Sequence, residues 1–336
     1  MAKFKVVHID GEPDGDWAME REILAEADAE LVVGGCKTDD EVVAVAADAD
    51  AILNRMYWMD RALFEKLPNA KVVVRGGVGF DNLDVEAATD CGLVVCNIID
   101  YGYNEVANHA FSMLLALNRK LFALDRAVRD GTRNPPPDAM AHTGRFTGQT
   151  LGLVSLGNIA QAVARRGKGF DMRVIAHDPY IDPAKAAALG VELVSLDELL
   201  AQSDYVSIHT PLSKETQGLI GARELGLMKP NAYIVLTSRG GLIDEAALVD
   251  ALREKRIAGA GIDVWEKEPV QKDHPLLQFD NVIATSHYAW YSEVSIMVLR
   301  QRIAEAAADV LRGVMPRSVV NPKILERVKL APRPPE

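Results

Sequence analysis

QTLGLVSLGNIAQAVARRGKGFDMRVIAHD, residues 149–178, holds two apolar runs with a glycine turn and an amphipathic segment between them. The first run, Leu151–Leu156, is short enough for a buried parallel strand, and a tight turn follows at Gly157. Apolar residues then recur at helical spacing until the second run, Met172–Ala176, which leads into Asp178. These features predict one strand–turn–helix–strand unit.

Units of this kind can bind a dinucleotide at the turn. The backbone N–H groups of the turn and the start of the helix hold the pyrophosphate, and an acidic residue about twenty positions later binds the ribose. Gly157 and Asp178 are 21 positions apart. The cofactor contacts that this spacing predicts are Ser155, Gly157, Asn158, Ile159 and Asp178.

The glycine fingerprint of this unit is incomplete. Where G-x-G-x-x-G is expected, residues 155–160 read SLGNIA, and only the middle glycine is present. That glycine lets the backbone approach the pyrophosphate, whereas Ser155 must fit a side chain into the turn and Ala160 is a common small alternative. An ordinary βαβ crossover with a glycine in its turn therefore remains open on this stretch alone.

Alternating strands and helices extend on both sides of this unit. Strands are expected near residues 4–9, 30–33, 50–53, 71–75 and 92–96, and again near 151–156, 172–177, 191–194, 204–208, 232–236, 258–262 and 281–284. Such alternation with short connections predicts parallel sheets covered by helices on both faces, an α/β fold. A chain of 336 residues is too long for one core, so we expect two domains.

Two long helical stretches bear on the domain boundaries. Residues 104–130 contain little to break a helix and are apolar on more than one side, which predicts a second cover such as a partner subunit. The last helix, about 293–312, has no clear strand after it, so we expect it to cross back to the first domain. The expected domains are residues 1–99 completed by 297–336, and residues 100–296, with a partly loose tail from Val319 onward.

Composition excludes several classes of partner. The formal charge is −11 and no Lys/Arg cluster offsets it, so no nucleic-acid partner is expected. Three cysteines, Cys36, Cys91 and Cys96, fit neither a disulfide framework nor a metal quartet, so they are expected to be reduced and no metal is predicted. No apolar run approaches the ~18 residues of a membrane span, and residues 3–9 read as a strand rather than a secretory signal. These features predict a soluble cytoplasmic protein without a membrane partner.

Three segments carry charged or titratable residues just past predicted strands. Arg239 precedes two glycines, and its planar fork suits a carboxylate. Asp263, Glu266 and Glu268 follow the next strand, and His287 follows the last one. Each has a plainer interpretation: an arginine leaving for solvent, a solvated acidic loop, and a structural histidine. Because the carboxyl ends of parallel strands share one edge of a sheet, the three segments together predict a site.

Taken together, these segments resemble the D-isomer-specific 2-hydroxyacid dehydrogenase superfamily. The resemblance covers nearly the whole chain, through VRGGVGFDNLDVEAA at 74–88, NEVANHAFSMLLAL at 104–117, SRGGLIDEAALVDAL at 238–252 and GIDVWEKEP at 261–269. SHYAWYSE at 286–293 and Arg75 look most like the branch that contains the C-terminal binding proteins. The resemblance implies two Rossmann-like domains with parallel sheets, a flavodoxin-like substrate domain and an NAD-binding Rossmann domain, which pair as a homodimer.

The resemblance also implies roles for individual residues. Arg239 falls on the arginine that binds the substrate carboxylate, His287 on the acid/base histidine, and Glu268 on its hydrogen-bonding partner. Further cofactor contacts fall on Thr210, Pro211, Thr237 and Asp263. Substrate contacts fall on Arg75, Gly77, Val78 and Trp290. The plainer interpretation of Trp290 is a helix-cap aromatic side chain buried against the first domain.

The implied activity is NAD-dependent hydride transfer to and from C2 of a small 2-oxo or 2-hydroxy acid. The alternative is an NADH-sensing binding module, like the corepressors of the same branch; the lack of long extensions beyond two domains favours the enzyme. Met56, Tyr57 and Trp58 follow the third strand and are candidates to select the substrate. Besides Ser155 and Ala160, the chain departs from the family pattern at Asn108, where many relatives have glutamate, and Ser286, where proline is usual.

Overall fold

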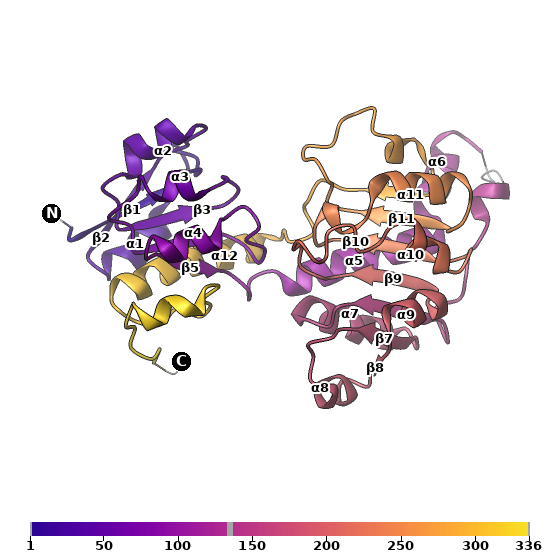
Figure 1. The fold of residues 1–336 in the computed structure, drawn as a ribbon. Coiled ribbons are helices and arrows are strands. Elements are labelled where there is room, and N and C mark those ends of the chain that lie inside the picture. Colours follow the sequence, from indigo (N-terminus) through magenta and orange to yellow (C-terminus); the bar gives the residue numbers. More distant parts are fainter. Residues whose placement is uncertain (1, 133–136, 335–336) are drawn as a thin grey trace. The chain divides into compact units, whose positions relative to one another are not determined.

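The computed structural model describes residues 2–132 and 137–334, which form two compact units (Figure 1). Unit 1 contains residues 1–102 and 292–336, and unit 2 contains residues 103–291. The expected boundaries at 99/100 and 296/297 lie a few residues away. The difference matters at the second boundary, because helix α12 (Glu293–Leu311) begins and ends within unit 1.

Unit 1 is built on one parallel sheet. Its strands are β1 (Phe4–His8), β2 (Ala29–Val33), β3 (Ala51–Asn54), β4 (Val72–Arg75) and β5 (Val94–Asn97). They lie in the order β2-β1-β3-β4-β5, and every pairing is parallel. This is the flavodoxin-like order, so the predicted fold class of this unit is confirmed.

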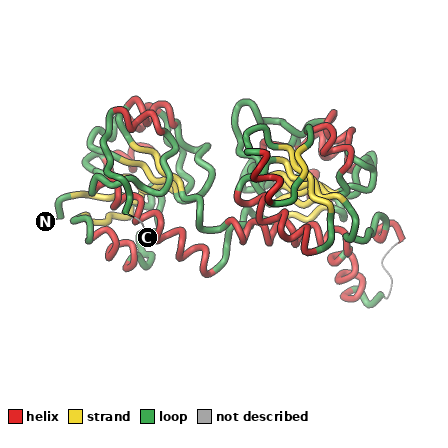
Figure 2. Tube along the Cα trace, turned by 90° about the horizontal axis from the view of Figure 1, so that it is seen from below, coloured by secondary structure: helices red, strands yellow, loops and turns green. Residues whose placement is uncertain are grey.

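Helices cover both faces of this sheet (Figure 2). They are α1 (Ala18–Ala25), α2 (Asp39–Ala46), α3 (Arg61–Phe64), α4 (Val85–Asp90) and α12. Helix α12 packs on α1 and β4, and Figure 1 shows this late segment beside the indigo strands of the N-terminal stretch. Arg300 of α12 donates to Glu20 of α1 over 2.8 Å, and the Glu20 carboxylate is buried. Two segments far apart in sequence therefore share one core.

The start of the C-terminal tail is ordered, so the expectation of a loose tail from Val319 is wrong for its first residues. Val320 N–H donates to the Val95 carbonyl at 2.8 Å, and Asn321 Oδ1 accepts from Val95 N–H at 2.8 Å. Ile324 is fully buried within the short 3-10 helix η4 (Pro322–Glu326). The tail thus adds hydrogen bonds to the free edge of β5, while residues 335–336 lie outside the described part.

Unit 2 contains a seven-stranded parallel sheet. Its strands are β6 (Thr150–Val154), β7 (Arg173–His177), β8 (Glu192–Leu193), β9 (Tyr205–Ile208), β10 (Tyr233–Leu236), β11 (Gly259–Ile262) and β12 (Val282–Ala284). The order is β12-β11-β10-β9-β6-β7-β8. The chain direction across the sheet reverses between β6 and β9, which creates the switch point of a Rossmann fold and confirms the predicted class.

The helices of unit 2 differ from expectation at one point. They are α5 (Tyr103–Arg119), α6 (Leu121–Arg129), α7 (Asn158–Gly169), α8 (Pro183–Ala188), α9 (Leu196–Gln202), α10 (Ala222–Leu227) and α11 (Glu245–Arg253). The single helix expected over residues 104–130 is wrong, because Lys120 has a left-handed backbone (φ 56°) that separates α5 from α6. The Lys120 ammonium donates to the Tyr233 hydroxyl at 2.8 Å, a tertiary contact that holds this break.

The apolar sides of α5 are covered within unit 2 itself. α5 packs on α7, β10 and β11, and Ala107, Leu114 and Leu117 are buried. The uncovered apolar side chains instead lie on α6, where Leu121, Phe122 and Val128 are 53%, 58% and 74% exposed. The apolar side chains that another surface could still cover therefore lie on α6 rather than along α5.

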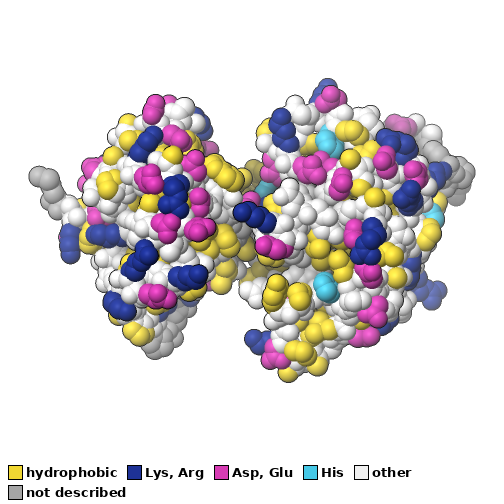
Figure 3. All heavy atoms as spheres, in the orientation of Figure 1, with side chains coloured by type: hydrophobic (Ala, Val, Ile, Leu, Met, Phe, Trp, Pro, Cys, Tyr) yellow, Lys and Arg dark blue, Asp and Glu magenta, His cyan; other side chains and the backbone are white. Residues whose placement is uncertain are grey.

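Surface and membrane features can be read from the described residues. On the face drawn in Figure 3, Lys and Arg side chains lie among Asp and Glu in each unit, and no single-sign basic patch is visible. None of the described helices has the length and hydropathy that crossing a membrane requires. Within the described ranges, no group of three or more His, Cys, Asp or Glu side chains is arranged to hold a metal ion, and all three cysteines are free.

Candidate active site

The turn between β6 and α7 carries the incomplete glycine fingerprint. Ser155, at the first glycine position, has a left-handed backbone with φ 77°. Gly157 is the N-cap of α7, and Asn158 and Ile159 are its first two residues. A Cβ atom built on Gly157 would meet nothing within 4 Å, so the packing of the protein does not itself require glycine there. A pyrophosphate that approaches the α7 N-terminus does, and the turn therefore fits a dinucleotide.

Alanine at the third fingerprint position also has a structural explanation. In the usual pattern the third glycine allows the helix and strand to pack closely. Here Ala160 is fully buried, and another tightly packed position lies two turns later at Gly167. A Cβ built on Gly167 would lie 2.6 Å from Leu151 Cδ2 of β6. Gly167 is thus one point at which α7 packs closely on β6.

Asp178 lies just past β7, where the ribose-binding carboxylate was expected. Its Oδ2 accepts hydrogen bonds from Leu156 N–H at 2.8 Å and from the Ser155 hydroxyl at 3.2 Å, and its Oδ1 accepts from the N–H groups of Tyr180 and Ile181. Burial alone would raise the pKa of Asp178, but these hydrogen bonds to its ionised form hold the pKa below its ordinary value. The carboxylate is therefore charged at neutral pH.

Thr210, Pro211 and Thr237 lie after β9 and β10, on the same edge of the sheet. The Thr210 hydroxyl donates to the Val154 carbonyl at the end of β6 over 3.3 Å. The Thr237 hydroxyl is buried and has no hydrogen-bond partner among the described residues. A buried hydroxyl without a partner is costly, and a bound polar ligand would satisfy it. The strand-end residues of unit 2 thus fit an NAD molecule along the carboxyl edge.

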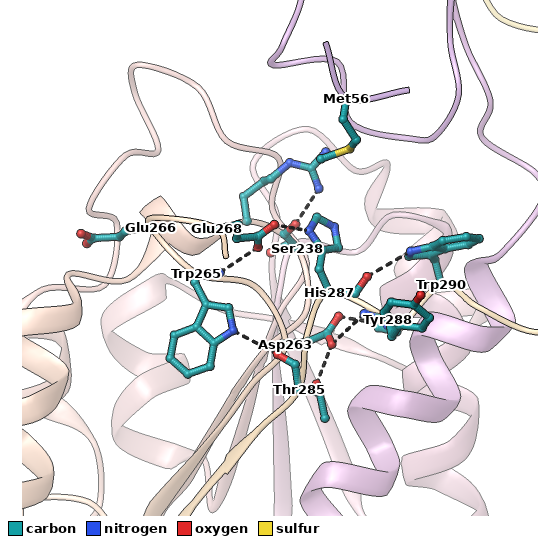
Figure 4. A network of polar contacts seen from close by, with 12 residues as sticks. Met56, Ser238, Asp263, Trp265, Glu266, Glu268, Thr285, His287, Tyr288 and Trp290 are labelled. Carbon is teal, nitrogen blue, oxygen red and sulfur yellow. Dashed lines mark hydrogen bonds and ion pairs between the residues drawn. The ribbon is translucent and has the colours of Figure 1, made fainter. Parts of the chain in front are cut away.

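Asp263 lies just past β11 and is completely buried. Its Oδ1 accepts from the Thr285 hydroxyl at 2.6 Å and from Tyr288 N–H at 3.1 Å, and its Oδ2 accepts from Ala289 N–H at 3.0 Å. Figure 4 shows this carboxylate below the His287 loop, with Thr285 and Tyr288 beside it. The predicted cofactor residue thus also supports the loop that carries His287.

His287 and Glu268 form the hydrogen-bonded pair that the sequence predicts. His287 Nδ1 lies 2.8 Å from Glu268 Oε2, and the two side chains are 28% and 31% exposed (Figure 4). A carboxylate can only accept, so Nδ1 carries the proton and Nε2 is left for chemistry. The backbone of His287 is left-handed (φ 59°), and its N–H donates to the Asp263 carbonyl at 2.7 Å. The left-handed backbone of His287 and its bond to Asp263 accompany the placement of the imidazole against Glu268.

The charge state of Glu268 follows from its surroundings. Burial would raise its pKa, but hydrogen bonds from His287 and from Trp265 N–H, with the charges of His287 and Arg239, hold the pKa below its ordinary value of 4.5. The Trp265 N–H donates to Glu268 Oε1 at 3.0 Å, so both carboxylate oxygens are engaged. Glu268 is consequently ionised at neutral pH.

Arg239 follows β10 and leads into the 3-10 helix η2 (Gly240–Leu242). Its Nη1 donates to the Ser238 carbonyl at 2.8 Å, and its charge reaches Glu268. The next residue, Gly240, packs directly on the Glu268 loop, because an added Cβ would lie 1.9 Å from the Trp265 carbonyl carbon. The loops that carry the three predicted catalytic residues are thus in mutual contact within unit 2.

Trp290 is half-buried beside His287. Its indole N–H donates to the His287 carbonyl at 3.0 Å, and its ring lies against Tyr288 and Tyr291 with centroids 6.2 and 5.7 Å away (Figure 4). The indole therefore supports the histidine loop, a role that neither interpretation of the sequence included. Its predicted contact with substrate stays a prediction.

The predicted substrate residues of unit 1 lie together at the carboxyl end of β4. Arg75 is the last residue of that strand and is buried, and its Nη1 donates to the Gly76 carbonyl at 3.1 Å. Gly77 has φ 151°, a backbone conformation that favours glycine, and an added Cβ would displace the end of the Arg75 side chain. The Val78 carbonyl accepts from the Asn97 side chain at 2.6 Å. The positive φ is thus the reason for glycine at this position.

The candidate substrate-selecting loop of unit 1 is anchored by Asp10. The Asp10 carboxylate accepts from the backbone N–H groups of Arg55, Met56 and Tyr57 at 2.7–3.1 Å. Met56 and Trp58 are 62% and 65% exposed, whereas the Tyr57 hydroxyl donates to Asp39 at 2.7 Å. Of the three candidates, Tyr57 is therefore committed to a contact within the unit.

Sequence reasoning missed several residues of this network. His109 Nε2, on α5, lies 3.0 Å from the Thr285 hydroxyl and 3.6 Å from Asp263 Oδ1. The Trp265 indole N–H donates to the Thr285 carbonyl at 3.0 Å. No local pattern marks either residue, because both partners are distant in sequence. Another histidine, His209, is half-buried with its Nε2 2.9 Å from the Ser207 hydroxyl, and desolvation lowers its pKa to about 3, so it remains neutral.

Comparison with known proteins gives the same assignment from sequence and from structure. Residues 111–289 match the family model described as the D-isomer specific 2-hydroxyacid dehydrogenase, NAD binding domain. The chain is 38% identical over 287 residues to a glyoxylate reductase of Korarchaeum cryptofilum, which covers 85% of this chain and 86% of that protein. Its structure resembles that of a glyoxylate reductase from Paecilomyes thermophila, with a TM-score of 0.86 and 28% identity over 96% of this chain and all of the other.

Another relative is much longer than this chain. The chain is 39% identical over 310 residues to a D-3-phosphoglycerate dehydrogenase of Methanocaldococcus jannaschii, and the match covers 91% of this chain but 58% of that protein. These relatives support the family and not the narrower branch that contains the C-terminal binding proteins. With its two parallel-sheet units and its matched NAD-binding domain, the chain belongs to the D-isomer specific 2-hydroxyacid dehydrogenases, a family of NAD-dependent oxidoreductases.

Proposed function

We propose that this protein interconverts small 2-oxo acids and 2-hydroxy acids, with NAD as the redox partner and His287 as the acid/base. The observation that carries the proposal is the 2.8 Å contact of His287 Nδ1 with an ionised Glu268 at the strand ends of the NAD-binding domain. An imidazole oriented by a carboxylate is suited to general acid–base catalysis near neutral pH. The similarity to a glyoxylate reductase over most of that protein's length supports a small 2-oxo acid as the substrate class.

The roles of the residues follow from their chemistry. In the reductive direction, protonated His287 gives a proton from Nε2 to the carbonyl oxygen, and in the oxidative direction neutral Nε2 takes it. Glu268 holds the tautomer and favours the imidazolium. Arg239, within electrostatic reach of Glu268, grips the substrate carboxylate and fixes the orientation of C2. When bound, NAD supplies the hydride chemistry.

Consumption of NADH in the presence of glyoxylate, hydroxypyruvate and phenylpyruvate tests the proposal. We expect at least one of these acids to be reduced, and His287→Ala to lower kcat/KM by roughly 10²–10⁴-fold. His142→Ala is the matched control, because His142 is an exposed histidine outside the site. Unchanged activity of His287→Ala, or no turnover of any 2-oxo acid by the parent, would count against the assignment.

Trp290 is proposed to pack against the side chain of the substrate. Trp290→Ala should then change the order of preference among glyoxylate, hydroxypyruvate and phenylpyruvate, with the melting temperature nearly unchanged. Because its indole also donates to the His287 carbonyl, Trp290→Phe should lower kcat while the order of preference is kept. A large loss of stability with an unchanged order would favour a purely structural aromatic.

The substrate contacts of unit 1 and the oligomeric state both stay predictions. Arg75, Gly77 and Val78 are predicted substrate contacts, and Arg75→Lys, which keeps the charge but removes the planar fork, should raise KM more than it lowers kcat. A homodimer is predicted from the apolar residues exposed on α6.

A further inference from the structure

We propose that His109 is a positioning residue for His287, acting through Thr285 and Asp263. The inference rests on the proposed function of His287 and adds to it a second histidine that does not touch the reacting atoms. All four residues belong to unit 2: His109 comes from α5, Asp263 follows β11, and Thr285 and His287 follow β12.

Counting protons fixes the direction of the chain of hydrogen bonds. The Thr285 hydroxyl lies 2.6 Å from Asp263 Oδ1 and 3.0 Å from His109 Nε2. The Thr285 hydroxyl has a single proton, and it is donated to Asp263 Oδ1. Towards His109 the hydroxyl oxygen must then accept, and His109 Nε2 must carry a proton. The structure therefore requires a donor at the ε position of residue 109.

Asp263 transmits this arrangement to the catalytic loop. Its carboxylate accepts hydrogen bonds from the N–H groups of Tyr288 and Ala289, and its backbone carbonyl accepts one from the N–H of His287. These three bonds hold consecutive residues, the first of which has a left-handed backbone that needs such support. The position of the His287 imidazole thus depends on Asp263 staying in place.

Burial explains why the distant histidine matters. The Asp263 side chain is 0% exposed, and among the described residues His109, at 3.6 Å, is its only basic partner within 4 Å. A buried carboxylate is tolerated when its oxygens are hydrogen-bonded and a compensating group is near. Without the donor at residue 109, the Thr285 hydroxyl is free to rotate away from Asp263, and one of the bonds that orient the carboxylate is lost.

The variants separate the hydrogen bond from the bulk of the side chain. His109→Leu keeps the volume and removes the donor, whereas His109→Gln keeps an N–H donor at the ε position. Asn108→Ala is the matched control, because Asn108 is the adjacent residue of α5 and its side chain binds Arg166 of α7, outside this network. Each protein is used as the full chain with saturating NADH.

The kinetic readout is the split between kcat and KM for reduction of a 2-oxo acid. We expect His109→Leu to lower kcat about tenfold, the loss of one buried hydrogen bond, while KM changes less than about threefold because Arg239 is untouched. His109→Gln should recover most of the kcat, and Asn108→Ala should keep it. An undiminished kcat in His109→Leu, an equal loss in His109→Gln, or an equal loss in Asn108→Ala would each overturn the proposal.

A second readout does not need activity. The backbone amides of Tyr288 and Ala289 should exchange with solvent deuterium faster in His109→Leu than in the parent and in His109→Gln, because both donate to Asp263. Nitrogen-15 histidine spectra of the parent should show a proton on His109 Nε2. If the parent reduces no 2-oxo acid, the function proposed for His287 fails, yet these measurements still decide the role of His109. Equal exchange in all variants, or an unprotonated Nε2, would overturn it.

Discussion

Two residues of the candidate site, Ser155 and His287, have left-handed backbones, with φ 77° and 59°. Such a conformation costs a non-glycine residue on the order of 1–3 kcal/mol and persists only when neighbours support it. The Ser155 hydroxyl bonds Asp178, and His287 bonds both Glu268 and Asp263. At both positions the strained backbone therefore belongs to a residue whose side chain is already committed to a carboxylate.

The charge of Glu268 should set the pH dependence of the reaction. Glu268→Gln keeps the shape and removes the charge that favours the imidazolium form of His287. Reduction needs that protonated form, so the reductive rate should fall at a lower pH in the variant, and alkaline oxidation should suffer less than neutral reduction. Profiles of kcat/KM from about pH 5 to about pH 9 measure this. Glu266→Gln, on the same loop, is the control, and overlaid profiles for Glu268→Gln and the parent would refute the role.

The acidic side of the pH–activity profile follows from the lowered pKa of Glu268. A carboxyl with a depressed pKa in the folded state adds stability that is present above its unfolded pKa, near 4.5, and is lost as pH falls through the lower folded pKa. The pair with His287 should therefore persist through the mildly acidic range. In the parent, loss of activity well above pH 4.5 would have to come from another group.

Asp178 should select NAD over NADP. Its carboxylate is ionised and would repel a 2′-phosphate, and the following residues, Pro179, Tyr180 and Ile181, include no arginine to receive one. We expect kcat/KM to favour NADH over NADPH by at least about tenfold, on the order of 1.4 kcal/mol. Asp178→Asn should reduce the preference for NADH over NADPH. Equal values for both cofactors in the parent would contradict the prediction.

At the scale of elements, the site is a set of loops that follow parallel strands and press on one another. The loop after β10 meets the loop after β11 at Gly240, and the loop after β12 meets the loop after β11 through the Asp263 bonds. The Trp265 indole joins the second and third of these loops by donating to the Thr285 carbonyl. Catalytic geometry at this scale depends on backbone contact as much as on side-chain identity.

Gly240→Ala should show the importance of that contact. The new Cβ would lie 1.9 Å from the Trp265 carbonyl carbon, so residues 265–266 must move. This movement would disturb the hydrogen bond that Trp265 N–H donates to Glu268. We expect the free energy of unfolding, measured in urea, to fall by about 1–3 kcal/mol, and kcat to fall with it. Gly241→Ala is the matched control, because its Cβ would lie at an ordinary 3.5 Å from Leu212. Equal stability of the two variants would disprove the close packing.

At the scale of the whole molecule, exposed apolar residues on α6 remain to be covered. Leu121, Phe122 and Val128 are each more than half exposed on this one short helix. Clustered apolar side chains of this kind mark interaction surfaces more often than scattered ones do. We expect the partner to be a second copy of the chain.

Light scattering at micromolar concentration should give the mass of a dimer, twice 36.6 kDa. Phe122→Glu should shift the mass towards the monomer, because a charge would be buried in the contact. Met297→Glu, an exposed apolar residue of unit 1, should leave the mass unchanged. A monomer mass for the parent would refute the dimer, and an unaffected dimer in Phe122→Glu would place the contact elsewhere.

The order of strands and helices, and the residues at strand ends, could be predicted from the chain alone. Apolar runs bounded by glycine, proline and polar residues are local signals, and a parallel sheet necessarily brings the carboxyl ends of its strands to one edge. Hence Arg239, Glu268 and His287 were predicted together, and the 2.8 Å contact between the last two agrees with that prediction. Family resemblance supplied their roles, which periodicity cannot.

Contacts between distant segments were decided only in the folded chain. The long helix breaks at Lys120, whose ammonium reaches Tyr233, 113 positions away, and His109 reaches Thr285 across 176 positions. Asn321 orders the tail by bonding β5 from 226 positions away. No window of sequence contains both partners of such a bond, so neither the helix break, the ordered tail nor the His109 network leaves a local pattern. Local patterning sets where strands end, whereas packing decides which side chains meet there.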